Sequence, residues 1–78
     1  MKAKEIIKNY AKDDNQNVKN ILIHIWFSET TSEDNLKRIR LNDLLNDELG
    51  NTEVTSWEVG HGTDENGKSC LCLQFYTY

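Results

Sequence analysis

Long apolar stretches are missing from this sequence. Nothing in it approaches the roughly 20 apolar residues that a membrane span needs. The first residues carry lysines but lack the apolar stretch of a signal peptide. Cysteine is also scarce, and the two that occur, Cys70 and Cys72, are too close along one strand to form a normal disulfide. We therefore expect a cytoplasmic protein with reduced thiols, located in the host-cell cytoplasm if a phage encodes it.

Low-complexity tracts are absent as well. Aliphatic and aromatic residues recur at regular spacing, which is typical of a folded chain rather than a disordered one. The length of 78 residues predicts a single domain spanning residues 1–78. A single core of this size typically contributes a net stability of only ~3–5 kcal/mol. Assembly into a homodimer, or docking on a partner protein, would add to that stability.

Motifs for catalysis and for phosphate binding are missing. The glycine-bearing stretch 60–67 does not follow the Gly-x-Gly-x-x-Gly pattern at the start of a helix, and no P-loop lysine motif is present. Cys72 and His61 could form a nucleophile–base pair, but one flat sheet face rarely supplies the pocket and oxyanion site that such a pair needs. The sequence therefore predicts that the protein is not an enzyme and uses no cofactor.

Positive charge is scarce in the second half of the chain. The net charge of −4 divides into +2 for residues 1–40 and −6 for residues 41–78. An acidic surface repels phosphates, which argues against direct nucleic-acid binding and favours a partner with a basic surface. The residues that we expect to contact such a partner are Asp43, Asp47, Glu48, Glu53 and Glu58. Taken alone, the charge is explained more simply by solubility.

The first part of the chain predicts a helix followed by a strand. Apolar residues at helical spacing from Ala3 to Ala11 indicate a short amphipathic helix, and the polar stretch 13–17 indicates a turn. The run 18–29 is rich in Ile, Trp and Phe, which is typical of a strand. On that strand, alternation places the apolar residues from Ile21 to Phe27 on one face.

The segment 30–50 predicts a helix. Ser32 is a good N-cap, and Gly50 is a natural stop. The apolar pattern changes phase near Arg40, so a short turn followed by a second helix is the alternative to one irregular helix, which we favour. The basic cluster 37–40 is then interpreted as the solvated side of that helix.

The last part of the chain predicts a β-hairpin. Asn66-Gly67 favours a type I′ turn between strands at 51–62 and 68–78. In that register Glu65 pairs with Lys68, which places His61 beside Cys72. It also sets Trp57 beside Tyr76, and Gly60 and Gly62 opposite two leucines. A bulge of one residue would exchange the faces.

These elements predict an α+β fold, with a short N-terminal helix followed by a β-α-β-β unit. The expected sheet has three strands in the order 1-3-2, with the last strand central and antiparallel to both neighbours. The helices would cover one face, which would carry Ile21, Ile23, Ile25, Phe27, Leu71, Leu73 and Phe75. The opposite face would expose His24, Trp26, Trp57, Cys70, Cys72, Tyr76 and Tyr78.

The cysteines on this second face have two interpretations. Cys70 and Cys72 with His61 offer thiolate and imidazole ligands, which suit zinc and would make a metal-stabilised module. Strand cysteines are more often small packing residues, and Cys-x-Cys is not the usual structural zinc spacing. We favour packing.

The aromatic residues of the second face are interpreted as a contact surface. Trp26, Trp57, Tyr76 and Tyr78 are of the types enriched at protein interfaces. The alternative is that the first helix or the loop 28–35 folds over this face. One short helix cannot cover a three-stranded sheet, so we favour partner contact.

The sequence thus predicts a small, non-enzymatic, acidic binding protein. Its compact, motif-free profile resembles that of small inhibitors encoded by phages or mobile elements, including anti-CRISPR and anti-restriction proteins. The likeness is one of profile, with no matched motif. It implies that the protein blocks a nucleic-acid-processing complex by protein–protein contact. The alternatives are a small homodimeric ligand-binding or regulatory module and the Cys/His metal-stabilised module.

Overall fold

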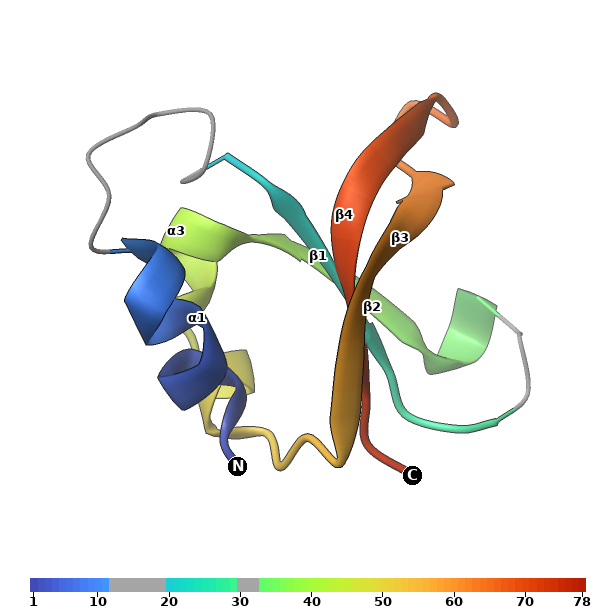
Figure 1. The fold of residues 1–78 in the computed structure, drawn as a ribbon. Coiled ribbons are helices and arrows are strands. Elements are labelled where there is room, and N and C mark those ends of the chain that lie inside the picture. The colour runs from blue at the N-terminus through green and yellow to red at the C-terminus, as the bar shows by residue number, and fades with distance from the viewer. Residues whose placement is uncertain (12–19, 30–32) are drawn as a thin grey trace.

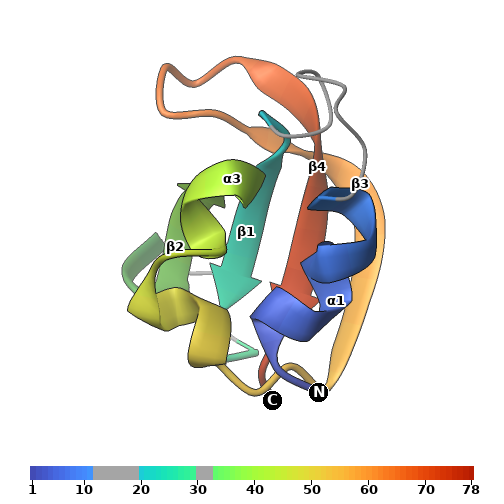
Figure 2. The same ribbon diagram turned by 90° about the vertical axis from the view of Figure 1, so that its left-hand side faces the viewer.

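A sheet with its α-helices on one face makes up the fold (Figures 1 and 2). The structure, a computed structural model, describes residues 1–11, 20–29 and 33–78. Its elements are α1 (Ala3–Ala11), β1 (Leu22–Trp26), η1 (Glu33–Asn35), β2 (Leu36–Arg40), α3 (Leu41–Leu44), η2 (Glu48–Asn51), β3 (Ser56–Thr63) and β4 (Ser69–Tyr76). The predicted α+β class is confirmed.

Some of the predicted boundaries cannot be compared with the structure. The predicted turn at 13–17 lies outside the described residues, as do residues 18–19 of the predicted strand and 30–32 of the predicted helix. The predicted N-terminal helix is present as α1, and Ala3, Ile6 and Ile7 on its apolar side are buried.

Within the described residues, four strands pair in the order β2-β1-β4-β3. The predicted three-stranded sheet is therefore wrong, although β4 does lie between β1 and β3. β4 runs parallel to β1 and antiparallel to β3, whereas β1 and β2 are antiparallel. The prediction that the last strand is antiparallel to both neighbours is also wrong, because the unpredicted strand β2 reverses the chain once more.

The extra strand comes from the segment that was predicted to be one helix. Leu36–Arg40 pairs along the whole of β1, and the α-helix begins only at Leu41. The phase change near Arg40 is thus the junction of a strand and a helix, not an irregularity within a helix. The backbone N–H of Leu41 donates to the carbonyl of Ile21 at 2.9 Å, which ties the start of α3 to the residue just before β1. Arg38 and Arg40 accordingly lie on a strand, not on a solvated helix face.

The core lies between the sheet and the helices. Ile23, Ile25, Leu73 and Phe75 point toward the helix layer and are at most 3% exposed. The rest of the core cluster consists of Ala3, Ile6, Ile7, Leu41, Leu44 and Val54. Burial of these apolar side chains is the main force that holds the helices to the sheet.

Two residues predicted for the helix-covered face are exposed instead. Phe27 is 41% exposed because it follows the last residue of β1 and is no longer held in the sheet. Leu71 is 61% exposed because it lies at the hairpin end of β4, which extends beyond the helices in Figure 1.

The β3–β4 turn differs from the predicted type I′ turn. Among the described residues only Gly67 has a positive φ, 79°, whereas a type I′ turn needs two such residues. The Asp64 carboxylate accepts hydrogen bonds from the backbone N–H groups of Asn66 and Lys68, at 2.8 and 2.9 Å. The Gly67 N–H donates to the Asp64 carbonyl at 3.0 Å. Asp64 thus closes a three-residue loop, and the strands pair one residue away from the predicted register.

This shift of one residue exchanges the faces of β3. Trp57 pairs with Phe75 rather than Tyr76, and His61 pairs with Leu71 rather than Cys72. Gly60 and Gly62 stand opposite Cys72 and Cys70 rather than opposite leucines. Gly60 and Gly62 therefore lie on the face away from the helices, whereas the side chains of Trp57 and His61, which were predicted for that face, belong to the opposite one.

The hairpin end of β3 curls over this second face. Although β4 separates β3 from β1, the Thr63 carbonyl of β3 accepts hydrogen bonds from His24 Nε2 of β1 and from Arg38 Nε of β2, both at 3.1 Å. Arg40 extends the contact through an ion pair with Glu65 at 2.9 Å. A flat sheet could not make these contacts, so the second face is concave.

Gly62 supplies the space for this close approach. A Cβ at this position would lie 2.5 Å from Cε1 of the His24 ring and 3.0 Å from Sγ of Cys72. Both neighbours are buried, and neither can move aside without disturbing the sheet.

We predict that Gly62→Ala lowers the free energy of unfolding by ~1–3 kcal/mol, as overpacking of a buried site typically does. Gly60→Ala is the matched control, because its Cβ would meet only Cγ of Gln74, at an ordinary 3.6 Å. Urea unfolding of the two variants measures the difference. Equal stability of the two variants would contradict the curled hairpin.

Candidate binding groove

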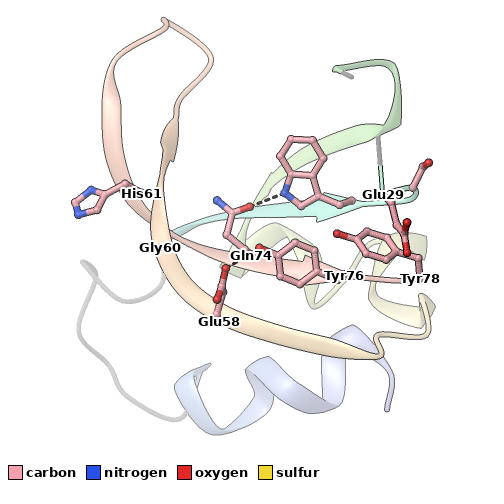
Figure 3. Close-up of a pocket in the computed structure, with 9 residues that line it drawn as sticks. Glu29, Glu58, Gly60, His61, Gln74, Tyr76 and Tyr78 are labelled. Atoms are coloured by element: carbon pink, nitrogen blue, oxygen red, sulfur yellow. Dashed lines mark hydrogen bonds between the residues drawn. The ribbon is translucent and has the colours of Figure 1, made fainter. Parts of the chain in front are cut away.

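The concave second face holds an open groove of about 410 Å³ (Figure 3). Its lining residues come from β1, β3, β4 and the segments that follow β1 and β4, and they are Trp26, Ser28, Glu29, Glu58, Gly60, His61, Gln74, Tyr76 and Tyr78. We refer to this site as the groove.

Gln74 fixes the orientation of the tryptophan in the groove. Its Oε1 accepts a hydrogen bond from Trp26 Nε1–H at 2.6 Å, drawn as the dashed line in Figure 3. Gln74 is only 7% exposed, so its amide is held by the sheet rather than by solvent. The indole is therefore held in place before any ligand arrives.

The same amide continues into a buried hydrogen-bond network. Gln74 Nε2 donates to His24 Nδ1 at 3.3 Å and to Cys72 Sγ at 3.0 Å. His24 Nδ1 accepts and its Nε2–H donates to Thr63, so the ring has the donor and acceptor of a neutral imidazole. Trp26, Gln74, His24 and the curled hairpin thus form one continuous network.

Burial changes the titration of two groups in this network. It lowers the pKa of His24 below its ordinary 6.5, and the nearby Arg38 charge lowers it further, against the opposing effect of the hydrogen bond to Thr63. Burial also raises the pKa of the Cys72 thiol, with a smaller contribution from Cys70. At neutral pH these groups are an uncharged imidazole and an uncharged thiol.

Two tyrosines form an aromatic wall of the groove. The Tyr76 hydroxyl donates to Glu58 Oε1 at 2.7 Å, and this bond, with burial, raises the pKa of Tyr76 to about 12. Tyr76 therefore stays protonated and holds the Glu58 carboxylate beside its ring. Tyr78 packs edge-on against it, with ring centroids 5.7 Å apart and planes at 62°.

The predicted aromatic contact residues do not all lie together. Trp26, Tyr76 and Tyr78 meet in the groove, with Glu58 among them. Trp57 shares the helix-side face with Phe75 and is 43% exposed there. Its predicted place on the second face is wrong, because the register differs by one residue.

The other predicted acidic residues lie outside the groove, on the helix side of the molecule or beside the N-terminus. These residues are Asp43, Asp47, Glu48 and Glu53, and all are exposed. The Asp47 carboxylate accepts from the Leu49 N–H at 2.9 Å and so caps η2, whereas Glu53 contacts the amino group of Met1 at 3.2 Å. The predicted acidic set is thus divided, with Glu58 alone in the groove.

The predicted proximity of His61 to Cys72 is wrong. Gly60 is the residue opposite Cys72, and the His61 side chain points away from the groove in Figure 3. Across residues 1–11, 20–29 and 33–78, no three His, Cys, Asp or Glu side chains gather as metal ligands. Two predicted alternatives required His61 to lie beside Cys72: the zinc site of Cys70, Cys72 and His61, and the catalytic Cys72–His61 pair. That proximity is not formed.

Several contributors to the groove were not predicted as contact residues, among them Gln74, Glu29 and Gly60. Gln74 was overlooked, although a polar residue between Leu73 and Phe75 in an apolar strand is a recognisable signal of a buried hydrogen bond. Glu29 was placed on the predicted strand without a role. Gly60 was predicted to lie opposite a leucine, and the observed hairpin register places it opposite Cys72, on the face that holds the groove.

Comparison with known proteins gives no further guide to this site. The chain matches no protein-family model, no curated protein and no solved structure. In the part of the chain that the structure describes, no helix is long and apolar enough to cross a membrane. The groove is therefore interpreted from its own geometry.

We predict that the fold loses stability as the pH falls from 7.5 to 5.5 because of His24. In the unfolded chain the imidazole titrates near 6.5, whereas its pKa is lower in the folded protein. Below 6.5 the unfolded chain thus binds more protons, and stability falls by up to about 1.4 kcal/mol per pH unit. Urea unfolding at several pH values measures the slope.

Two variants distinguish the contribution of His24 to this pH dependence from that of His61. His24→Gln should remove most of this slope, and His61→Gln, which changes an exposed residue, should retain it. A slope that survives His24→Gln would show that other groups cause it.

Proposed function

We propose that the chain is a non-enzymatic binding protein that contacts a partner protein through the groove. The observation that carries this proposal is the open groove in which Trp26, Tyr76 and Tyr78 gather. Hydrogen bonds to Gln74 and Glu58 hold Trp26 and Tyr76 in fixed orientations. Oriented aromatic side chains bury a large area on binding and lose little conformational entropy.

The state of the polar groups supports binding rather than catalysis. Both ring nitrogens of His24 are engaged and the ring is buried, so it has no free site for proton transfer to a substrate. The Cys72 thiol is buried and its raised pKa disfavours the thiolate. Tyr76, with a pKa of about 12, does not ionise at neutral pH.

The charge of the chain supports a partner with a basic surface. The net charge is −4, and a basic surface is typical of proteins that handle nucleic acids. We therefore propose the inhibitor class, in which a phage or mobile-element protein blocks a CRISPR or restriction complex by protein contact in the host cytoplasm. Direct nucleic-acid binding is not part of this proposal.

Self-association is the second candidate, and a different surface favours it. Trp57, Val59 and Leu71 lie on the helix-side face of the β3–β4 hairpin and are 43%, 61% and 61% exposed. Contiguous exposed apolar side chains often mark a protein interface. Dimerisation through this strip would leave the groove free for a ligand or partner.

We predict that partner binding depends on the groove and not on this apolar strip. A partner captured by the tagged chain from cells of its source is purified, and its affinity is measured by calorimetry. Tyr78→Ser, in the groove, should weaken binding at least tenfold, as loss of a central aromatic contact commonly does. Trp57→Ser, at a side chain of similar exposure on the other face, should change the affinity by less than about twofold.

The reverse result, with binding lost in Trp57→Ser and kept in Tyr78→Ser, would move the interface to the apolar strip. Light scattering of the same variants reports self-association. The second candidate would be favoured by two results together. The chain would form a dimer that Trp57→Ser dissociates, and Tyr78→Ser would leave the affinity for the partner unchanged. Thermal melting confirms that each variant is folded.

A further inference from the structure

The groove is negatively charged where its aromatic wall lies. The carboxylates of Glu29 and Glu58 lie beside Tyr76 and Tyr78 (Figure 3), and both glutamates are exposed. Among the described residues that line the groove there is no lysine or arginine. The Tyr76 hydroxyl occupies Glu58 Oε1 without neutralising its charge.

A cation is the ligand that these groups favour. The faces of aromatic rings carry partial negative charge and attract cations, and the attraction strengthens as water is excluded. A neutral apolar ligand would instead remove water from two carboxylates and return no charge to them, which is costly.

We infer that the groove binds an arginine side chain on a segment of the partner protein. This inference rests on the proposed function. A guanidinium stacks on aromatic rings and donates paired hydrogen bonds to a carboxylate, whereas a lysine ammonium does neither as well. The rings of Tyr76 and Tyr78 supply the stacking surface, and the Glu58 carboxylate that Tyr76 holds in place supplies an acceptor.

A second hollow fixes where along the bound segment the arginine must lie. This hollow, about 270 Å³, shares Trp26, His61 and Gln74 with the groove and continues toward Arg38. The Arg38 guanidinium donates to Thr63 and places positive charge at that end. The bound segment therefore carries its arginine at the Glu58 end and no cation at the Arg38 end.

The test uses blocked peptides that differ only in the charge of one side chain. A short glycine–serine peptide with one arginine is compared with the same peptide carrying citrulline, the uncharged isostere, or lysine. The readout is the NMR signal of the Trp26 indole N–H, which lies in the groove. Trp57, on the other face, supplies the second indole signal as an internal reference.

The arginine peptide should shift the Trp26 signal and leave that of Trp57 in place. The citrulline peptide should bind at least tenfold more weakly, and the lysine peptide should lie between them. Raising the salt concentration from about 20 to about 200 mM should weaken binding of the arginine peptide, because screening reduces attraction between exposed charges.

Glu58→Gln, which retains an acceptor for Tyr76, should weaken binding of the arginine peptide at least fivefold. Asp43→Asn, on the helix side, should not.

Two results would overturn this inference. One is equal binding of the arginine and citrulline peptides. The other is the absence of any Trp26 shift at about 10 mM peptide, well above the ~1 mM affinity expected of a weak contact. Neither would overturn the proposed function, which is decided by the Tyr78→Ser and Trp57→Ser pair with the whole partner.

Discussion

The carbonyl oxygen of Thr63 is the point on which the shape of the sheet depends. It accepts hydrogen bonds from His24 and Arg38, although its own strand, β3, and the strand of Arg38, β2, are the two edges of the sheet. A sheet brings both edges to one atom only by curling, and this curl makes the second face concave. The missing side chain of Gly62 gives the approach its space. The groove thus follows from how the sheet closes on itself.

The network behind Thr63 also couples the stability of the fold to the form of the groove. Gln74 can accept from Trp26 and donate to His24 only while Nδ1 of His24 carries no proton. A charged imidazole would place two donors against each other in a buried site, which is costly. The interactions that close the hairpin therefore also orient the indole, so a change at His24 affects both.

Local signals predicted the fold class, the first helix, β1 and the hairpin: helical spacing for α1, β-prone residues for β1 and the Asn66-Gly67 turn for the hairpin. Periodicity was the main signal for the rest of the chain. It failed at residues 36–40, where five residues fit a strand and a broken helix equally well, and pairing with β1 decides between them. The hairpin register failed for another reason. Asn66-Gly67 favours a type I′ turn, but the Asp64 carboxylate stabilises a longer loop by capping two backbone N–H groups.

The shift of one residue between the predicted and the observed pairing of β3 with β4 changes the shape of the second face. With Trp57 in place of the glycines, the face would be broad and aromatic, which suits a large, flat protein interface. With Gly60 and Gly62 on it, the hairpin curls inward and the face narrows to a groove around Trp26, Tyr76 and Tyr78. A groove of about 410 Å³ has room for a chain segment or a single side chain. Three of the four aromatic residues predicted for the second face, Trp26, Tyr76 and Tyr78, do lie together in the groove. The groove itself follows from the curl, which depends on contacts between residues distant in sequence and so could not be read from the sequence pattern.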